Sequence, residues 1–463
     1  MNTKKQFPKP ISIKKLIGPS FIILALGLGS GEVILWPYMS ANYGLGIAWG
    51  ALLGITFQYF INLEIERYAL VKGESVFVGI AKIFPKAIYW FIISTFIGFG
   101  LPGIIAASAH VFASIFGIEN FKWIAILFLI IIGFILSFGK TVYIVMEKLT
   151  KIIILVGVPF IFLLTLYLAS STDWVMLLKG FVGRGEGFSF LPVGIGLATF
   201  LGAFAYSGAG GNLNLTQSIY IKEKGYGMGK YSQKIAGLFN KNKIDEKIKL
   251  HGEDFEDTEE NYNRFKKWWK AISIEHFIIF WFIGLFSMSV LMLLSYATTY
   301  GLADNTEGIN FVISEGTVIG EKTFALLGKV FLFVLGIMLF QTQLGVLDST
   351  SRIMSENLAI KFLNSGKKDE IKLSKIYFSF VWAQILFGMI LFLFNIYEPK
   401  TLIILGAVIN AFAMFVHTAL VFITNHKLLE KKYRPVWWRK IIILCIFLFF
   451  GFFSFIVFLD KIK

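Results

Sequence analysis

Two short glycine-rich segments interrupt long apolar stretches of this chain. The first, at residues 28–32, reads Leu-Gly-Ser-Gly-Glu, and the second, at residues 207–212, reads Ser-Gly-Ala-Gly-Gly-Asn. A helix inside a lipid bilayer has no water to satisfy its backbone, so an unwound turn is tolerated only where it is buried or lines a cavity. A pair of such breaks in corresponding halves of a chain is typical of the substrate site of a secondary transporter.

The composition is that of a helical membrane protein. Of the 463 residues, 56% are hydrophobic and only 16% are charged, whereas a soluble domain carries roughly a quarter charged residues. An outer-membrane barrel is excluded, because its strands would alternate with a period of two residues. A helix needs about 20 apolar residues to cross a bilayer. The sequence therefore predicts an all-α polytopic protein with about eleven spans, at 17–41, 46–70, 88–116, 122–139, 151–170, 192–221, 272–298, 323–360, 375–396, 400–425 and 438–459.

Basic residues are concentrated in alternate loops. If the N-terminus is cytoplasmic, the inner segments hold 35 of the 44 Lys and Arg residues, and the outer segments hold seven. This asymmetry follows the positive-inside rule. We therefore expect a multi-pass protein of the inner or plasma membrane, with a cytoplasmic N-terminus and an outer C-terminus. The net charge of +15 then reflects topology and attraction to anionic lipid, and no nucleic-acid partner is expected.

The two breaks fall in predicted spans one and six. Because five spans separate the starts of the two halves, the second half enters the membrane in the opposite orientation, which is the layout of an inverted-repeat transporter with a site at the midplane. Close helix packing through small residues is the alternative explanation of the glycines. We expect a cytoplasmic N-terminus at 1–16, five-helix repeats at 17–170 and 171–425, with a cytoplasmic loop at 222–270, and an additional eleventh span in 426–463.

The expected site residues come from both breaks and from two later spans. Glu32 follows the first break directly, so it is assigned to substrate binding, to metal ligation and to coupling. His110 in span three is a candidate proton carrier, although a packed neutral histidine explains it equally well. Glu64 and Glu66 are interpreted as members of a local ion pair with Arg67. The expected substrate-binding set is Gly29, Ser30, Gly31, Glu32, Ser207, Gly208, Ala209, Gly210, Asn212, Gln343 and Asn410.

Two patches of the chain resemble the Nramp family of divalent-metal transporters. Residues 18–21 read Gly-Pro-Ser-Phe, and the chain continues after the first break to Asn-Tyr-Gly at 42–44. Nramp proteins similarly open with Gly-Pro-Gly-Phe and continue to a Tyr-Gly pair. Residues 341–343 read Gln-Thr-Gln, and residues 349–356 read Ser-Thr-Ser-Arg-Ile-Met-Ser-Glu, which is similar to the family's polar span eight. The resemblance implies the LeuT-like fold and ion-coupled uptake.

The chain departs from the family at both breaks. Nramp proteins carry Asp-Pro-Gly-Asn at the first break and Met-Pro-His at the second, and those segments supply metal-binding Asp, Asn and Met side chains. No Met, His or Asp stands at residues 29–32 or 208–211, so these ligands cannot be carried over. A site with oxygen donors only would suit a hard cation such as Mg²⁺, with manganese or iron left open. The alternative substrate is an amino acid or another small carboxylate, which free amides at the start of a half-helix attract.

The absence of certain sequence motifs argues against several other function classes. The chain has no P-loop sequence, which argues against ATP drive, and it has no His-Glu-x-x-His motif or paired catalytic carboxylates within a span, which argues against an enzyme. A channel remains an alternative, although it would need a continuous selectivity element. We therefore expect a secondary transporter without a permanently bound cofactor. H⁺ is the expected coupling ion with Na⁺ left open, the partners are the transported ion or solute and the lipid bilayer, and the oligomeric state is open.

Overall fold

The computed structural model describes residues 4–11, 16, 18–138, 142–235, 249–302, 308–366, 372–397 and 399–462. These residues form helices, and within them strand-like pairing is limited to two isolated bridges. The all-α class is therefore confirmed. The first half contains α1 (Pro19–Gly27), the π-helical turn η2 (Ser30–Leu35), α2 (Trp36–Tyr43), the turn η3 (Leu45–Ile47), α3 (Ala48–Lys72), α4 (Val76–Ile83), α5 (Ala87–Phe99), α6 (Gly103–Phe116), α7 (Lys122–Ser137) and α8 (Val142–Leu168).

The second half begins with a short helix that leads to the second break. It contains α9 (Ser171–Gly180), α10 (Leu197–Ala205), the turn η4 (Gly211–Leu215), α11 (Thr216–Lys224), the turn η5 (Gly227–Tyr231), α13 (Glu259–His276), the π-helical turn η6 (Phe277–Ile283), α14 (Gly284–Thr299), α15 (Ile309–Lys322), α16 (Ala325–Asn364), α17 (Leu373–Leu393), α18 (Pro399–Leu428), the turn η7 (Lys431–Tyr433) and α19 (Trp437–Ile462).

Every predicted span corresponds to a helix or a helix pair. Among the described residues, eight helices are long and apolar enough to cross a bilayer. Helix α1 and the helical segment Gly31–Tyr43 are bent by 44° relative to each other, and they make a ninth span if the pair is counted as one. The short helix α7 and the broken pair of α10 and α11 occupy the remaining predicted spans. The chain is thus a multi-pass membrane protein, while the total of eleven crossings and the division into two repeats stay predictions.

Two boundaries and two short helices differ from the sequence prediction. Helix α8 begins at Val142, not at residue 151, because Val142, Tyr143 and Met146 supply a buried face that extends the helix toward its start. The loop predicted over residues 222–270 is partly helical, since α13 begins at Glu259 and Thr258 caps it through the amide of Asn261. Helices α4 and α15 were not predicted, because both are shorter than a membrane span.

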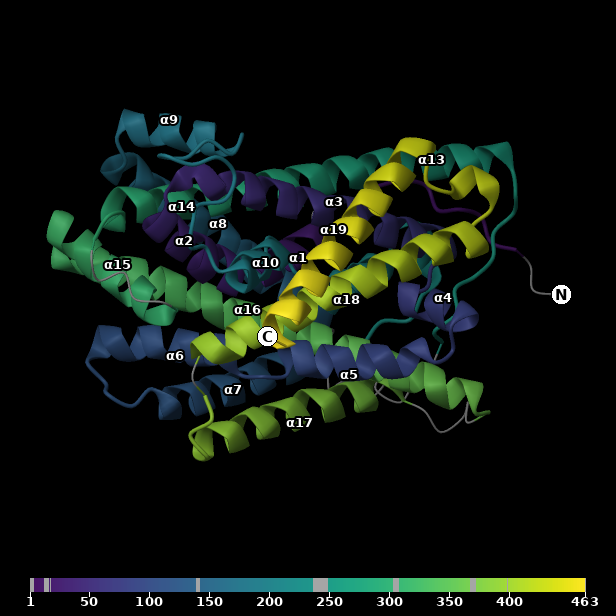
Figure 1. Cartoon of the computed structure of the whole chain (residues 1–463). Helices are drawn as coiled ribbons and strands as arrows, with labels where there is room; N and C mark the ends of the chain where they lie inside the picture. The colour runs from purple at the N-terminus through teal and green to yellow at the C-terminus, as the bar shows by residue number, and fades with distance from the viewer. Residues whose placement is uncertain are drawn as a thin grey trace.

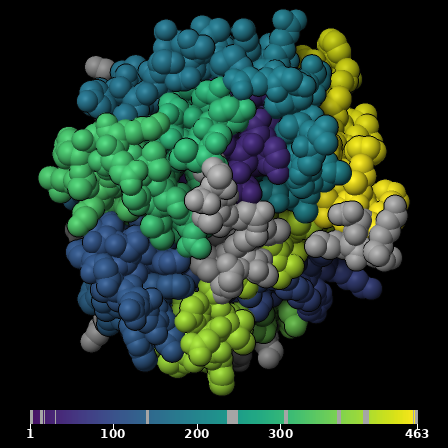
Figure 2. Space-filling model, turned by 60° about the vertical axis from the view of Figure 1, so that its left-hand side comes forward, coloured from purple at the N-terminus to yellow at the C-terminus, as the bar shows by residue number. Residues whose placement is uncertain are grey.

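The helices run side by side along one long axis (Figure 1). The N-terminus, α4 and the start of α13 lie at one end of the bundle, and α9, α15 and the turn between α6 and α7 lie at the other. Helix α16 passes through the middle and packs against α5, α6, α15 and α17. Turned toward the α15 end, the molecule shows its early residues, coloured purple, enclosed between teal and green segments (Figure 2). Every residue of α1 is buried, so the first half of broken span one lies inside the bundle.

The outer surface of α19 shows how the bundle meets lipid. Its exposed apolar side chains recur every three or four residues, which places them on one face of the helix. They are Ile441, Leu444, Leu448, Phe452 and Phe455. An apolar stripe that faces outward on a membrane-spanning bundle is suited to contact with acyl chains.

Candidate functional site: two helix breaks in contact

The two breaks lie directly against each other. A Cβ atom placed on Gly27, the last residue of α1, would lie 2.7 Å from the Cα atom of Gly208 in the second break. A Cβ atom placed on Gly31 would overlap the carbonyl oxygen of Tyr206. The backbones approach so closely that only glycine fits at Gly27 and Gly31. The structure thus brings together Gly29, Gly31, Gly208 and Gly210, which the sequence had placed in one site.

The second break spans residues 206–210 between α10 and η4, and a side chain from α3 satisfies its backbone. Gln58 donates its Nε2 proton to the carbonyl oxygen of Ala205 at 2.9 Å and accepts a proton from the amide of Gly210 at 3.0 Å. Gly210 has a φ of +72°, in the left-handed region that favours glycine. Gln58 is fully buried, so its amide replaces the water that the bilayer cannot supply.

The first break is shorter and is satisfied from α16. Helix α1 ends at Gly27, and the chain resumes as the π-helical turn η2 from Ser30. The hydroxyl of Thr342 donates to the carbonyl oxygen of Ala25 at 3.2 Å. A Cβ atom on Gly29 would overlap the Thr342 side chain. At each break, a polar side chain from a neighbouring intact helix bonds the backbone beside the unwound residues.

We expect Gln58→Leu to destabilise the protein by about 1–3 kcal/mol, because the buried amide of Gly210 and carbonyl of Ala205 would lose their partner. Thermal unfolding in detergent measures the change. Gln384→Leu is the matched control: Gln384 is also buried and bonds the hydroxyls of Thr350 and Ser351, but Thr350 keeps a second bond to the carbonyl of Val346. Equal losses in both variants would contradict a special role for Gln58 at the break.

Glu32 is the carboxylate that the first break buries. It lies in η2 and has no solvent exposure, and its Oε2 atom accepts a hydrogen bond from Ser287 of α14 at 2.8 Å. Among the described residues its Oε1 atom has no hydrogen-bond partner. A buried carboxylate oxygen without a donor is free to bind a proton or a cation. The sequence prediction that Glu32 is an ionisable group beside the breaks fits this position.

The other predicted residues differ in their hydrogen-bond partners. Ser207 accepts a hydrogen bond from the indole of Trp36 at 3.0 Å, which ties the second break to α2. Asn410 of α18 donates to the Tyr206 hydroxyl at 3.0 Å, so it lies beside the same break. Ala209 is buried within the break. The side chain of Ser30 lies outside the described residues.

Asn212, Gln343 and His110 have different surroundings. The amide of Asn212 donates to Ser94 and Thr95 of α5, at 2.8 and 3.0 Å. Gln343 is buried beside Thr342 on α16, and within the described ranges its Oε1 atom lacks a hydrogen-bond partner. The ring of His110, within α6, stacks on Phe121, the residue before α7, with centroids 4.7 Å apart. This environment fits the packed-histidine alternative, and the coupling role of His110 stays a prediction.

Sequence reasoning missed three residues that complete the site. Gln58, Thr342 and Ser287 are buried polar residues on three different intact helices, and each bonds a break residue or its neighbour. The available signal was a polar side chain inside an apolar span, which marks a functional or structural site in lipid. That signal does not say which break a side chain faces, because helices that are far apart in sequence meet only in the fold.

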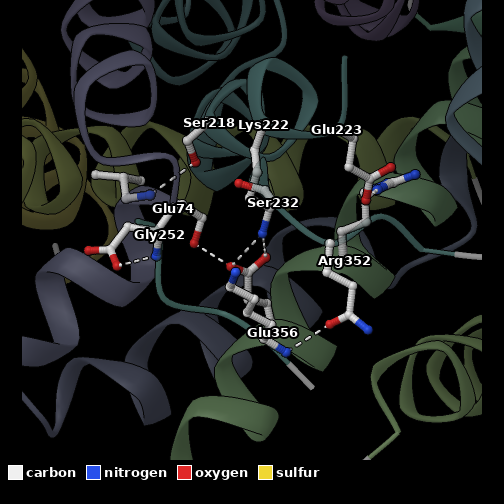
Figure 3. Close-up of polar contacts among 12 residues, drawn as sticks. Glu74, Ser218, Lys222, Glu223, Ser232, Gly252, Arg352 and Glu356 are labelled. Atoms are coloured by element: carbon white, nitrogen blue, oxygen red, sulfur yellow. Dashed lines mark hydrogen bonds and ion pairs between the residues drawn. The ribbon is translucent and has the colours of Figure 1, made fainter. Parts of the chain in front are cut away.

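A buried ion-pair network joins α11 to α16 (Figure 3). Lys222 of α11 lies 3.2 Å from Glu356 of α16, and Glu223 lies 2.6 Å from Arg352. Asp348 pairs with Arg352 at 2.8 Å, one helical turn further along the same helix. All five side chains are buried. The network ties the second half of broken span six to span eight.

A further acidic residue, Glu74, lies between α3 and α4 and is labelled in the same view (Figure 3). It accepts a hydrogen bond from the Gly252 amide at 3.2 Å and lies 2.6 Å from Lys82. Burial alone would raise its pKa, but hydrogen bonds from His251 and Lys82 lower the pKa of Glu74 to about 2. Glu74 is therefore ionised at any physiological pH. It helps to hold α4 and the segment around Gly252 against the end of α3.

Comparison with known proteins supports the fold. No protein-family model and no curated protein sequence matches the chain. A mutant of the manganese transporter of Eremococcus coleocola is 12% identical with a TM-score of 0.69, over 98% of this chain and 90% of that one. The same transporter in complex with an aromatic bis-isothiourea substituted compound is 11% identical with a TM-score of 0.68, over 98% and 89% of the two chains.

A third solved structure has a different ligand. MhsT in complex with L-phenylalanine is 14% identical with a TM-score of 0.51, over 95% of this chain and 97% of that one. All three likenesses cover nearly the whole chain at low identity, so they describe its architecture. They confirm the LeuT-like fold that the sequence resemblance implied.

Proposed function

We propose that this protein is an ion-coupled secondary transporter and that its substrate is a divalent metal cation. The observation that carries the proposal is the contact between the breaks at Gly27 and Gly208, beside the buried carboxylate of Glu32. A midplane site between two broken helices is the arrangement that alternating-access transporters use. The likeness to a manganese transporter supports a metal as the substrate.

The available donors favour a hard cation. Within the described ranges, no group of three or more His, Cys, Asp or Glu residues is arranged to hold a metal ion. The donors at the breaks are the free Oε1 atom of Glu32, backbone carbonyls and neutral side-chain oxygens. Oxygen donors suit Mg²⁺ and Mn²⁺, and the absence of a thioether removes a preference for softer metals. A partly hydrated ion would need only a few of these protein oxygens.

The proposed orientation places the N-terminus in the cytoplasm. The N-terminus, α4 and the start of α13 share one end of the bundle (Figure 1), and the basic loops of the sequence belong to the same side. By the positive-inside rule that end faces the cytoplasm. The ion pairs of Arg352 and Lys222 then lie on the cytoplasmic side. We propose the inner or plasma membrane as the location.

Uptake by proteoliposomes tests the function, with Mn²⁺ and Mg²⁺ as the probes. We expect saturable Mn²⁺ uptake by the wild type, and a loss of at least about tenfold in Glu32→Gln, which corresponds to about 1.4 kcal/mol of lost binding. The matched control is Glu315→Gln, because Glu315 is also buried and accepts a hydrogen bond from a serine, Ser295 at 2.6 Å. Glu315→Gln should transport normally.

The same assay separates the alternatives. Uptake of radiolabelled amino acids without uptake of either metal would overturn the metal substrate and favour an organic solute. A fast current that does not saturate would indicate a channel. Normal Mn²⁺ uptake by Glu32→Gln would remove Glu32 from the site while leaving the transport function in place.

A further inference from the structure

A second buried cluster of ionisable side chains lies where α1 begins, separate from the two breaks. Ser20 comes from the first turn of α1, Glu66 from α3, Gln217 from α11, and Glu275 and His276 from the end of α13. Four of these side chains have no solvent exposure, and Glu275 is 5% exposed. The cluster therefore joins the first half of broken span one and the second half of broken span six to two intact helices.

The polar atoms of the cluster contact one another directly. Ser20 donates its hydroxyl proton to Glu275 at 2.5 Å, and the same oxygen lies 2.9 Å from Nδ1 of His276. His276 Nδ1 in turn lies 3.2 Å from Oε1 of Glu66. Gln217 donates to that same Glu66 oxygen at 2.6 Å. The contacts form an unbroken chain from Glu275 through Ser20 and His276 to Glu66.

Packing fixes the histidine in the middle of this chain. The ring of His276 stacks on Phe280 with centroids 4.7 Å apart and on Tyr59 with centroids 5.6 Å apart. The interplanar angles are 6° and 17°. Two aromatic contacts hold the ring plane so that Nδ1 points at Ser20 and Glu66. The chain of contacts is therefore built into the fold.

The two carboxylates have no Lys or Arg partner among the described residues. In the part of the chain that the structure describes, neither Glu66 nor Glu275 forms an ion pair with Lys or Arg, while Glu64, two residues away, pairs with Arg67 at 2.7 Å and Arg439 at 2.9 Å. The sequence prediction of a local pair with Arg67 is thus right for Glu64 and wrong for Glu66. Buried charges without a partner are strongly destabilising, so one proton within the group of Glu66, Glu275 and His276 stabilises the buried cluster.

Other charged groups near the cluster have partners of their own. Lys151 and Lys224 pair with Glu147, at 2.5 and 2.8 Å, and Arg439 pairs with Glu64. Within the described ranges, one oxygen each of Glu66, Glu275 and Gln217, and Nε2 of His276, have no hydrogen-bond partner. The titratable and charged groups that face the cluster from the surrounding elements are Tyr59, Tyr143, Glu147, Lys151, Lys224, Tyr226 and Arg439.

We propose that Glu66, Glu275 and His276 form the site that carries the coupling proton, an inference that rests on the proposed transport function. Hydrogen bonds of 2.5–2.9 Å join Ser20 to Glu275 and to His276, and Gln217 to Glu66, and His276 Nδ1 lies 3.2 Å from Glu66, so a proton in the cluster has both carboxylates and the imidazole within reach. A bound metal would need these oxygens around a central ion, and no group of three metal-binding residues is arranged that way among the described residues. A proton on one carboxyl group removes the excess negative charge.

The site links the proton to the conformation of the inner half-helices. Ser20 belongs to α1 and Gln217 belongs to α11, while Glu66, Glu275 and His276 belong to α3 and α13. When α1 moves away to open the inner side, Ser20 leaves Glu275 and water reaches both carboxylates. The carboxyl O–H then gives its proton to water and becomes a carboxylate. Protonation thus favours the state in which the inner side is closed, and opening releases the proton inside.

Proteoliposomes that contain a Mn²⁺-quenched dye and a pH dye test the proposal. For the wild type we expect an inward proton gradient to stimulate Mn²⁺ uptake and the lumen to acidify with it. In Glu66→Gln and Glu275→Gln, downhill Mn²⁺ uptake should persist while stimulation and acidification are lost. The control variant Glu315→Gln should keep the stimulation by the proton gradient and the acidification of the lumen. Retained stimulation in both cluster variants would overturn the proposal, as would drive by Na⁺ in place of protons.

A second measurement needs no substrate, so its result does not depend on whether the proposed transport function is correct. The melting temperature of purified protein is measured between about pH 5 and 8, over which a carboxyl group protonated only in the folded state makes stability fall as pH rises. We expect this fall to be smaller in Glu66→Gln and in Glu275→Gln than in the wild type. A purely structural role would shift the melting temperature equally at every pH, and equal slopes in all three proteins would overturn the shared proton.

Discussion

Arg352→Met is expected to destabilise the protein by about 3–5 kcal/mol, because it leaves buried carboxylates without their cation. Arg352 has no solvent exposure, and its guanidinium binds Asp348 at 2.8 Å and Glu223 at 2.6 Å. Methionine keeps most of the aliphatic volume and removes the charge and the five donors. Thermal unfolding in detergent, with the folded fraction from size-exclusion chromatography, measures the loss.

A compensated variant separates lost charge from lost packing. Arg352→Met combined with Asp348→Asn and Glu223→Gln removes the ion-pair network as a whole, and replacing a whole buried network is often close to neutral. We expect the triple variant to recover part of the stability that the single variant loses. A triple variant as unstable as Arg352→Met would mean that side-chain shape, and not the unpaired charge, explains the effect.

Gly27→Ala is the second change with a large expected effect. Alanine normally stabilises a helix relative to glycine, by up to about 1 kcal/mol. At Gly27 the new Cβ atom would lie 2.7 Å from the Cα atom of Gly208, and a backbone atom cannot move aside as the end of a side chain can. We therefore expect Gly27→Ala to destabilise the protein, by about 1–3 kcal/mol or more. Uptake should fall with it.

The control for this change is another helical glycine with space around it. A Cβ atom on Gly157 of α8 would find its nearest neighbour, the sulfur of Met338, at 3.5 Å, which is an ordinary contact. Gly157→Ala should therefore leave the melting temperature unchanged or raise it slightly. If Gly27→Ala also leaves it unchanged, the backbones of spans one and six are not in contact in the native protein.

Much of the fold could be predicted because a lipid bilayer restricts the structures that a chain can adopt. Apolar stretches of the length of a bilayer must be helices, so the predicted stretches at 46–70 and 438–459 coincide closely with α3 and α19. The glycine-rich segments at 28–32 and 207–212 were recognised because unwound backbone in a membrane has few explanations. Helices α4 and α15 were missed because a short helix that does not cross the bilayer gives no length signal.

The partners of the site residues were harder to predict. Asp348 and Arg352 are one helical turn apart, so their ion pair follows from spacing alone. Glu64 and Glu66 look alike in sequence, next to the same Arg67. In the structure Glu64 faces Arg67 and Arg439, whereas Glu66 faces Gln217 and His276. Residues two apart on a helix point in different directions, and only packing decides what each one meets.

The sequence by itself determined the membrane class, the position of most helices and the two places where the backbone comes apart, because hydrophobic length and unsatisfied backbone groups are local properties. The tertiary structure decided that the breaks touch at Gly27 and Gly208, that Gln58 and Thr342 hold them, and that Glu66 meets Glu275 through Ser20 and His276. These contacts join residues more than a hundred positions apart. They depend on how helices pack, which no local pattern encodes.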